Sequence, residues 1–233
     1  MRAVGASVTR LNVGDDVFGT TFMQGFGAFA EGVAVSEELV VRKPPNVTHD
    51  EAAAVPLAAL TALQGLRDHG HLQPGQKVLV IGASGGVGSF AVQIAKAFGA
   101  DVSGVCSTKN IELVTSLGAG RVIDYTNPGS WDDIDRYDLI LQAAGTRTAS
   151  DCRRLLQPTG TLVQISGESE NQWFGPLGRI VAGRLLSSFV SQTITTCTVQ
   201  PNRNDLELLA GLLDEGKVRP VIDATYPLEE FDD

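Results

Sequence analysis

A glycine-rich turn near residue 85 carries the residue types that bind a diphosphate group. It follows the apolar run 77–81, and Ala83, Gly85 and Gly88 occupy the three places of a G-x-G-x-x-G pattern, with alanine in the first. Glycine at position 85 lets the backbone approach a diphosphate, and glycine at position 88 lets a helix pack closely on a strand. Because the free N–H groups at the start of that helix attract an anion, the segment predicts a dinucleotide site, with a plain glycine turn as the alternative.

The end of the next expected strand, over 101–106, indicates which dinucleotide would bind. In an NAD enzyme an acidic residue about 20 positions beyond the turn bonds the ribose hydroxyls. Here the residues after Cys106 are Ser107, Thr108 and Lys109, which supply two hydroxyls and an ammonium but no carboxylate. These groups could hold a 2′-phosphate, so the segment predicts NADP(H). The alternative for Ser107, a cap on the helix that starts near Lys109, is compatible with phosphate binding.

Alternating apolar strands and amphipathic helices are the elements that would position these residues. In the first helix, apolar residues recur at 87, 91, 94, 95 and 98, a spacing that predicts one apolar stripe against a sheet. Because parallel strands need crossover connections, the alternation predicts an α/β fold with a doubly wound parallel sheet of the Rossmann type. The six expected strands are 77–81, 101–106, 121–124, 138–143, 161–166 and 194–199.

The first 45 residues follow a different pattern, in which glycine interrupts short apolar segments. Residues 13–19, 25–31 and 32–35 are expected to be strands of an all-β region. Lys43-Pro44-Pro45 then marks a linker.

Two helices are expected after this linker. Thr48 and Glu51 have the spacing of a capping box, which predicts the start of a short alanine-rich helix. Pro56 is placed to begin a second helix, and Gly70 is placed to end it.

Composition argues against several classes of protein. The 233 residues carry a formal net charge of -9, which would repel a phosphate backbone, so nucleic acid is not an expected partner. No apolar run reaches the length of a membrane span and the first residues lack the pattern of a signal peptide, so a cytoplasmic protein is expected. Cys106, Cys152 and Cys197 lack C-x-x-C spacing and are expected to be buried thiols, and no metal is expected.

Six motifs, taken in their order along the chain, resemble the medium-chain dehydrogenase/reductase superfamily and its zinc-free quinone oxidoreductase branch. The resemblance covers essentially the whole chain, and the ordered set is far more specific than the glycine turn alone. The motifs are VGDDVFG (13–19), GAFAE (27–31), AAAVPLAALTAL (52–63), GASGGVG (82–88), SLGA (116–119) and GKVRPVID (216–223).

The resemblance implies a division into domains. A partial GroES-like β domain, which holds the substrate, is expected over 1–45, and linker helices with a Rossmann NADP-binding domain over 46–217. A truncated return segment to the β domain is expected over 218–233. The resemblance further implies an active site between the domains. Relatives have additional strands before the first residues and a helix and strand after the last ones, so the chain is expected to be a fragment lacking both ends.

The resemblance also implies which residues bind the cofactor. Thr61 matches a threonine beside the nicotinamide, with a helix residue bonded back to a carbonyl as the alternative. Lys109 and Tyr125 match positions that bind the 2′-phosphate, although Tyr125 could equally be an interface or partly buried tyrosine. Residues 144–145 and 165–167 lie at carboxyl ends of strands, where ligands bind in open α/β sheets. The expected cofactor-binding residues are Thr61, Ala83, Ser84, Gly85, Gly86, Val87, Gly88, Ser107, Lys109, Tyr125, Ala144, Gly145, Ile165, Ser166 and Gly167.

The implied activity is hydride transfer from NADPH to a quinone or an α,β-unsaturated carbonyl. Zinc-dependent relatives use cysteine ligands, but this sequence has no cysteine before Cys106 and no ligand in 56–60, so the chemistry is expected to need no zinc. No side chain stands out as a proton donor, and no catalytic residue is assigned. An enoyl reductase module of a larger synthase and a nucleotide-binding protein without turnover are the alternatives. Unpaired strand edges in an incomplete β domain would favour association, so a homodimer is also considered.

Overall fold

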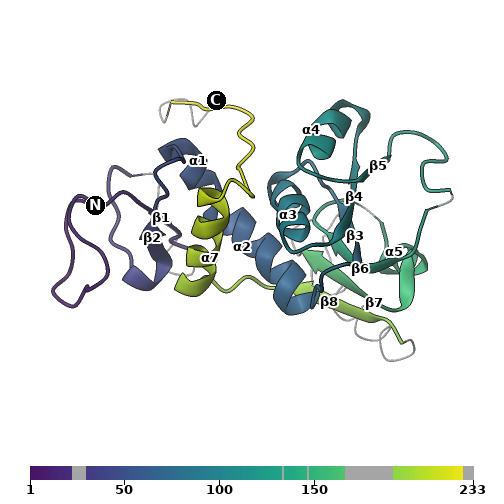
Figure 1. Cartoon of the computed structure of the whole chain (residues 1–233), viewed down its shortest axis with the longest axis horizontal. Helices are drawn as coiled ribbons and strands as arrows, with labels where there is room; N and C mark the ends of the chain where they lie inside the picture. The colour runs from purple at the N-terminus through teal and green to yellow at the C-terminus, as the bar shows by residue number, and fades with distance from the viewer. Residues whose placement is uncertain (23–29, 133, 146, 166–190, 228–233) are drawn as a thin grey trace, which may run out of the picture. The chain divides into compact units, whose positions relative to one another are not determined.

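The computed structural model describes residues 1–22, 30–132, 134–145, 147–165 and 191–227 (Figure 1). The chain divides into two compact units. The first is formed by Met1–Leu60 together with Gln200–Asp233, and the second by Thr61–Val199. The sequence instead grouped 46–60 and 200–217 with the nucleotide domain, and the functions of the two units stay predictions.

The second unit contains a six-stranded parallel sheet, which confirms the expected doubly wound fold. Its strand order is β5-β4-β3-β6-β7-β8, so the chain moves outward from β3 in one direction and from β6 in the other. Val78, Leu79 and Val80 of the central strand β3 are fully buried, as expected for a strand covered on both faces. The strands are β3 Lys77–Ile81, β4 Asp101–Cys106, β5 Arg121–Asp124, β6 Tyr137–Gln142, β7 Leu156–Ile165 and β8 Thr193–Cys197.

Because crossovers between parallel strands are almost always right-handed, the helices that follow the two directions of this strand order are expected on opposite faces of the sheet. Helix α3 packs on β3 and β4, α4 packs on β4 and β5, and α5 packs on β7 (Figure 1). The bounds are α2 Pro56–Gln64 followed by a π-helical turn over Gly65–His69, α3 Gly86–Ala97, a 3-10 turn over Thr108–Asn110, α4 Ile111–Ser116 and α5 Ala149–Arg154. The expected helix from Pro56 to Gly70 is therefore confirmed in outline.

Helix α3 is more deeply buried than its sequence pattern predicts. Ala91, Ile94 and Ala95 of the expected stripe are fully buried and the helix packs on the sheet, but every residue from 88 to 95 is buried, so burial extends beyond one stripe. Two polar side chains in this stretch are satisfied within the helix: Ser89 Oγ donates to Gly86 O at 3.0 Å, and Gln93 Nε2 donates to Ser89 O at 3.0 Å. Polar residues that bond back to their own helix can be buried without leaving a donor unpaired.

Strand β7 starts five residues before the expected position at 161. The segment Gln157-Pro158-Thr159-Gly160 has the composition of a turn, yet it continues the strand. The pairing with β6 shifts register between Tyr137 and Leu139, and an irregularity of this kind lets the strand accommodate proline. A Cβ at Gly160 would lie 2.9 Å from Tyr137 O, so only glycine fits at this crossing.

The first unit contains a small antiparallel sheet formed by β1 Val17–Gly19 and β2 Val40–Arg42. The strand expected over 32–35 is wrong, because these residues lie outside any strand and Val33 is 55% exposed. Most of the strand expected over 25–31 lies outside the described residues. A Cβ at Gly19 would collide with Leu39 O, which accounts for glycine at the end of β1, beside the point where the 3-10 turn Glu37–Leu39 leads into β2.

Two helices complete the first unit, α1 His49–Ala54 and α7 Arg203–Asp214. The capping box of α1 is confirmed: Thr48 Oγ1 accepts from Glu51 N at 3.2 Å, and Glu51 Oε2 accepts from Thr48 N at 2.8 Å. Hydrogen bonds from Thr48 lower the pKa of the Glu51 carboxyl, and the bond from the Thr48 backbone contributes most. Helix α7 packs on β2, and Arg203 Nη1 donates to Glu37 O at 2.9 Å. Among the helices of the described ranges, none has the length and apolar character needed to cross a bilayer.

Candidate functional site

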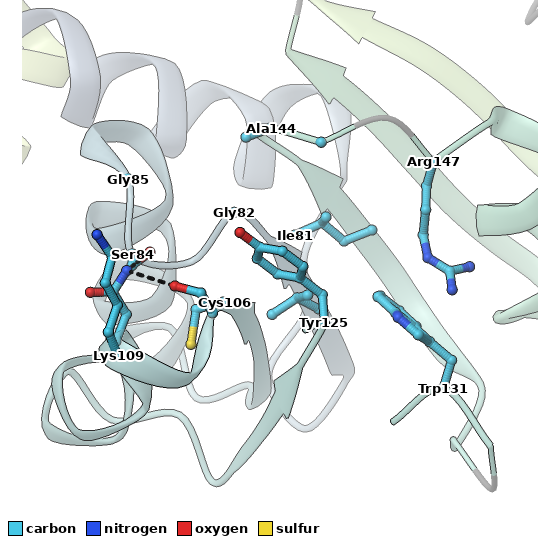
Figure 2. A pocket seen from close by; sticks show the side chains of 14 residues that line it. Ile81, Gly82, Ser84, Gly85, Cys106, Lys109, Tyr125, Trp131, Ala144 and Arg147 are labelled. Carbon is cyan, nitrogen blue, oxygen red and sulfur yellow. Dashed lines mark hydrogen bonds between the residues drawn. The ribbon is translucent and has the colours of Figure 1, made fainter. Parts of the chain in front are cut away.

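A cavity of about 570 Å³ lies at the carboxyl ends of four neighbouring strands of the second unit (Figure 2). Strands β3 and β6 are neighbours whose following connections lead to opposite sides of the sheet, and such a switch point opens a crevice where ligands bind. The lining residues are Ile81, Gly82, Ser84 and Gly85 at and after the end of β3; Val105, Cys106, Ser107, Lys109 and Asn110 at and after the end of β4; Tyr125 and Trp131 after β5; and Ala144, Gly145 and Arg147 after β6.

Main-chain hydrogen bonds join three of these strand ends beneath the cavity. The backbone N–H groups of Gly82 and Ala83 donate to Val105 O at 3.2 and 2.9 Å. The N–H groups of residues 143 and 144 donate to Ile81 O at 2.9 and 3.3 Å. We call this group of four bonds the main-chain floor of the cavity, and none of its atoms belongs to a side chain.

The glycines of the turn after β3 have two different roles. Gly82 has φ +84°, and a Cβ at Gly88 would lie 2.7 Å from Gly82 C and collide with Gly82 O, so both positions need glycine for the chain to fold as it does. A Cβ at Gly85 would meet no atom closer than 3.5 Å, and one at Gly86 would meet none within 4 Å. The space beside Gly85 is therefore open, as a site for a closely approaching ligand requires.

Helix α3 begins at this open space. Gly85 is its N-cap in an extended conformation, and its oxygen accepts from Ser89 N at 2.8 Å. Within the described ranges, the N–H groups of Gly86, Val87 and Gly88 have no hydrogen-bond acceptor. Three unpaired N–H groups at the positive end of a twelve-residue helix form a binding place for an anion.

The residues after β4 form a second polar group on the cavity wall. Asn110 Nδ2 donates to Ser84 Oγ at 3.0 Å and to Ser107 Oγ at 3.4 Å, and Lys109 lies beside them (Figure 2). Ser107 occupies the N-cap position of the following turn, but its side chain makes no capping bond, so the capping alternative is wrong. Asn110 was missed from the sequence because its partner Ser84 is 26 residues away.

Thr108, the second hydroxyl expected beside a phosphate, does not line the cavity. Its Oγ1 donates to Asp124 Oδ2 at 2.6 Å, and Thr126 Oγ1 donates to Asp124 Oδ1 at 2.7 Å. These two hydroxyl bonds lower the pKa of the Asp124 carboxyl, and the bond from Thr108 contributes most. The carboxylate at the end of β5 is thus held by two threonines and does not line the cavity.

An aromatic and a cationic side chain meet at another part of the wall. The guanidinium carbon of Arg147 lies 3.5 Å from the ring centroid of Trp131, a cation–π contact (Figure 2). Gln142 positions the loop that carries Arg147, because its Nε2 donates to Arg147 O at 2.9 Å. Buried Gln164 donates in turn to Gln142 Oε1 at 2.9 Å. The sequence pattern does not indicate this group, because it depends on a loop contact that residue spacing does not reveal.

The cavity lining carries positive charge in an acidic chain. Lys109 and Arg147 are its charged side chains, and no carboxylate occurs in the lining that the structure describes. Burial in the first place, with a smaller contribution from Asp124, raises the pKa of the Cys106 thiol. This cysteine therefore stays protonated near neutral pH and is not an activated nucleophile.

The expected cofactor-binding residues lie in four kinds of place. Ser84, Gly85, Ser107, Lys109, Tyr125, Ala144 and Gly145 line the cavity, while Ala83, Gly86, Val87 and Gly88 belong to the turn and first helical residues beside it. Tyr125 is 59% exposed at the cavity, and its alternative role at an interface stays a prediction. Thr61, whose carbonyl accepts from Cys197 Sγ at 3.8 Å, and Ile165 do not line the cavity. Ser166 and Gly167 lie outside the described residues.

Residues 117–233 match a family model described as zinc-binding dehydrogenase. The chain is 34% identical to a chloroplast envelope quinone oxidoreductase homolog of Arabidopsis thaliana, with 99% of this chain and 70% of that protein covered. It is also 34% identical to an NADPH-dependent alkenal/one oxidoreductase of the same plant, of which it spans only 54%, with 96% of this chain covered. The quinone oxidoreductase from Coxiella burnetii matches with a TM-score of 0.84 and 27% identity, over 97% of this chain and 69% of that one.

The parallel sheet with a glycine turn at its switch point defines an α/β protein of the dinucleotide-binding class. The comparisons make the assignment narrower. The chain belongs to the medium-chain dehydrogenase/reductase superfamily, and its relatives include quinone oxidoreductases.

The name of the matched family raises the question of zinc. Among the described residues, no three His, Cys, Asp or Glu side chains come together as a group that could hold a metal ion. The donors in these ranges therefore do not fit a zinc site, and membership of the zinc-free branch stays a prediction. A cytoplasmic location also stays a prediction, since the first relative is named for the chloroplast envelope.

Proposed function

We propose that the cavity binds NADPH and that the protein transfers a hydride from it to a quinone or an α,β-unsaturated carbonyl. The observation that carries the proposal is the pairing of two anion-binding groups on one cavity. One is the set of free N–H groups at residues 86–88, which lie beside the cavity at the start of α3, and the other is Lys109 with Ser107, which line it. Dinucleotides that carry a 2′-phosphate present two separate phosphate groups, which match these two places.

Each part of the wall has a distinct task in this proposal. The N–H groups of Gly86, Val87 and Gly88 bind the diphosphate, and the open space at Gly85 admits it close to the backbone. Lys109 supplies the charge that a 2′-phosphate needs, and a carboxylate that would repel this phosphate does not occur in the described lining. Tyr125, which is largely exposed at the cavity, is a weaker candidate for the same phosphate.

The chemistry needs little from the protein beyond binding and orientation. A bound nicotinamide supplies the hydride, and the chain orients the reactants and excludes water. No described side chain is assigned as a proton donor. We further propose that residues 1–45 belong to the substrate domain. The name of the alkenal/one oxidoreductase supports enones as acceptors. The names of the chloroplast envelope quinone oxidoreductase homolog and of the Coxiella quinone oxidoreductase support quinones.

A titration with NADPH and NADH tests the cofactor, and consumption of NADPH with a benzoquinone or an alkenal tests the reaction. We expect tighter binding of NADPH and its oxidation by at least one acceptor. A preference for NADH would refute the assignment of Lys109. Binding of NADPH without turnover on any acceptor would favour a nucleotide-binding protein without catalysis.

The variant Lys109→Ala makes the titration specific. It removes a charge-assisted contact, which contributes about 1.5 to 3 kcal/mol, so NADPH affinity should fall about tenfold or more while NADH affinity stays nearly constant. Lys96→Ala is the matched control, because Lys96 is an exposed lysine of the same unit that does not line the cavity. Equal losses for the two cofactors in Lys109→Ala would show that Lys109 does not bind the 2′-phosphate.

A further inference from the structure

One amide group links two hydroxyls on the cavity wall. Asn110 Nδ2 donates to Ser84 Oγ, in the turn after β3, and to Ser107 Oγ, at the end of β4, at 3.0 and 3.4 Å (Figure 2). Both serines line the cavity, as does Asn110 itself. A contact to one nitrogen brings the two hydroxyl oxygens close enough to meet the same ligand group.

These bonds decide what the hydroxyls can offer to a ligand. A serine hydroxyl has one O–H donor and two acceptor lone pairs. Because each Oγ uses a lone pair to accept from Asn110, its O–H proton must point elsewhere. Within the described ranges, neither Ser84 nor Ser107 has an acceptor for that proton. Two hydroxyl donors are therefore left for a ligand in the cavity.

We propose that Asn110 is a positioning residue that turns the Ser84 and Ser107 hydroxyl protons into the cavity, so that this wall selects a phosphate monoester over a free ribose hydroxyl. The inference rests on the proposed function, since the phosphate monoester is the 2′-phosphate of NADPH. A phosphate dianion can only accept hydrogen bonds, and two oriented hydroxyls beside the Lys109 ammonium provide the donors it needs. A ribose hydroxyl can both donate and accept, so it gains less from donors that are fixed in one direction.

The substitution Asn110→Asp reverses this arrangement with almost no change of shape. A carboxylate has no donor, so both serine hydroxyls would turn their protons toward residue 110 and away from the ligand. The new negative charge would also repel the phosphate. Asn110→Leu removes the donor without adding a charge. Asn127→Asp is the matched control, because it makes the same chemical change at an exposed residue that does not line the cavity.

The experiment measures binding of adenosine 2′,5′-bisphosphate and adenosine 5′-monophosphate to the whole chain, together with NADPH and NADH. In Asn110→Asp, affinity for the two ligands with a 2′-phosphate should fall about 100-fold, while affinity for the other two changes by less than about threefold. In Asn110→Leu the loss should be about tenfold, the size expected for one hydrogen bond to a charged group. Asn127→Asp should bind all four ligands as the wild type does.

The outcomes separate the inference from the function on which it rests. If the wild type prefers the bisphosphate and Asn110→Asp keeps that preference, the inference is wrong and the proposed cofactor stands. If the wild type binds both adenosine phosphates equally, the NADP(H) preference itself is wrong and the inference falls with it. A uniform loss for all four ligands in Asn110→Leu and Asn110→Asp would assign Asn110 a purely structural role and would also overturn the inference.

Discussion

The two glycines at positions 85 and 88 should respond in opposite ways to the same added methyl group. In Gly88→Ala the new Cβ would lie 2.7 Å from Gly82 C and 2.9 Å from Ala83 Cα and would collide with Gly82 O. These are backbone atoms, and the N–H groups of both residues are bonded to Val105 O, so they cannot move aside easily. Overpacking typically costs about 1 to 3 kcal/mol, and a backbone obstacle favours the upper end of that range.

Part of this cost is offset, because alanine is a better helix former than glycine by up to about 1 kcal/mol. The net loss for Gly88→Ala is then about 2 kcal/mol. For a chain of this size it corresponds to a fall of about 4 to 8 °C in melting temperature. Gly85→Ala should stay within about 0.5 kcal/mol of the wild type, because its Cβ meets nothing closer than 3.5 Å.

Urea denaturation and NADPH titration of both variants check this contrast. Gly85→Ala should unfold at the wild-type urea concentration but bind NADPH more weakly, because its methyl group occupies the space beside the start of α3. Gly88→Ala should unfold earlier. Wild-type stability in Gly88→Ala would refute the close packing of α3 on this turn, and wild-type NADPH affinity in Gly85→Ala would refute the placement of the diphosphate.

Three further predictions concern groups outside the phosphate-binding walls. Burial is the main cause that raises the pKa of the Cys197 thiol to about 11 from an ordinary value near 9. The stability that this thiol contributes is therefore complete below about pH 9 and is lost as the pH rises through 11. Cys197→Val should flatten the plot of unfolding free energy against pH between these values, and an unchanged slope would contradict the prediction. Gln142→Leu removes the hydrogen bonds that Gln142 makes to the Arg147 carbonyl and the Gln164 amide, so it should cost about 1 to 3 kcal/mol of stability and weaken NADPH binding. Tight NADPH binding with unchanged stability would show that the loop with Arg147 does not need the bond from Gln142. Elemental analysis after chelator washing should find no bound zinc, and one zinc ion per chain would overturn the zinc-free prediction.

Local sequence patterns were sufficient for the central part of the sheet. Strands β3, β4 and β5 have the expected bounds, because each is a short apolar run with clear turn residues on both sides. Strand β7 was placed too late, because Pro158 and Gly160 have the composition of a turn and only the pairing with β6 keeps them in the strand. The strand expected over 32–35 was wrong for a related reason, since an apolar segment becomes a strand only where a neighbour pairs with it.

The candidate site was predictable where its residues follow one another along the chain. The turn with Gly85 and the strand end with Ser107 and Lys109 carry their chemistry in consecutive positions, and these residues do line one cavity. Asn110 and Arg147 could not be found in this way. Their roles depend on contacts with Ser84 and Trp131, which the fold brings near from distant parts of the sequence.

The main-chain floor of the cavity separates the scaffold from its selectivity. Its four hydrogen bonds, which link Ile81, Val105 and their neighbours, use no side-chain atom, so changes at residues 107–110 leave them intact. Affinity for one cofactor or the other can therefore drift or be redesigned by exchanging a few wall residues, at little risk to folding. Under the proposed function, the main-chain geometry of the turn would therefore set where a dinucleotide lies, and the wall residues would set which one is preferred.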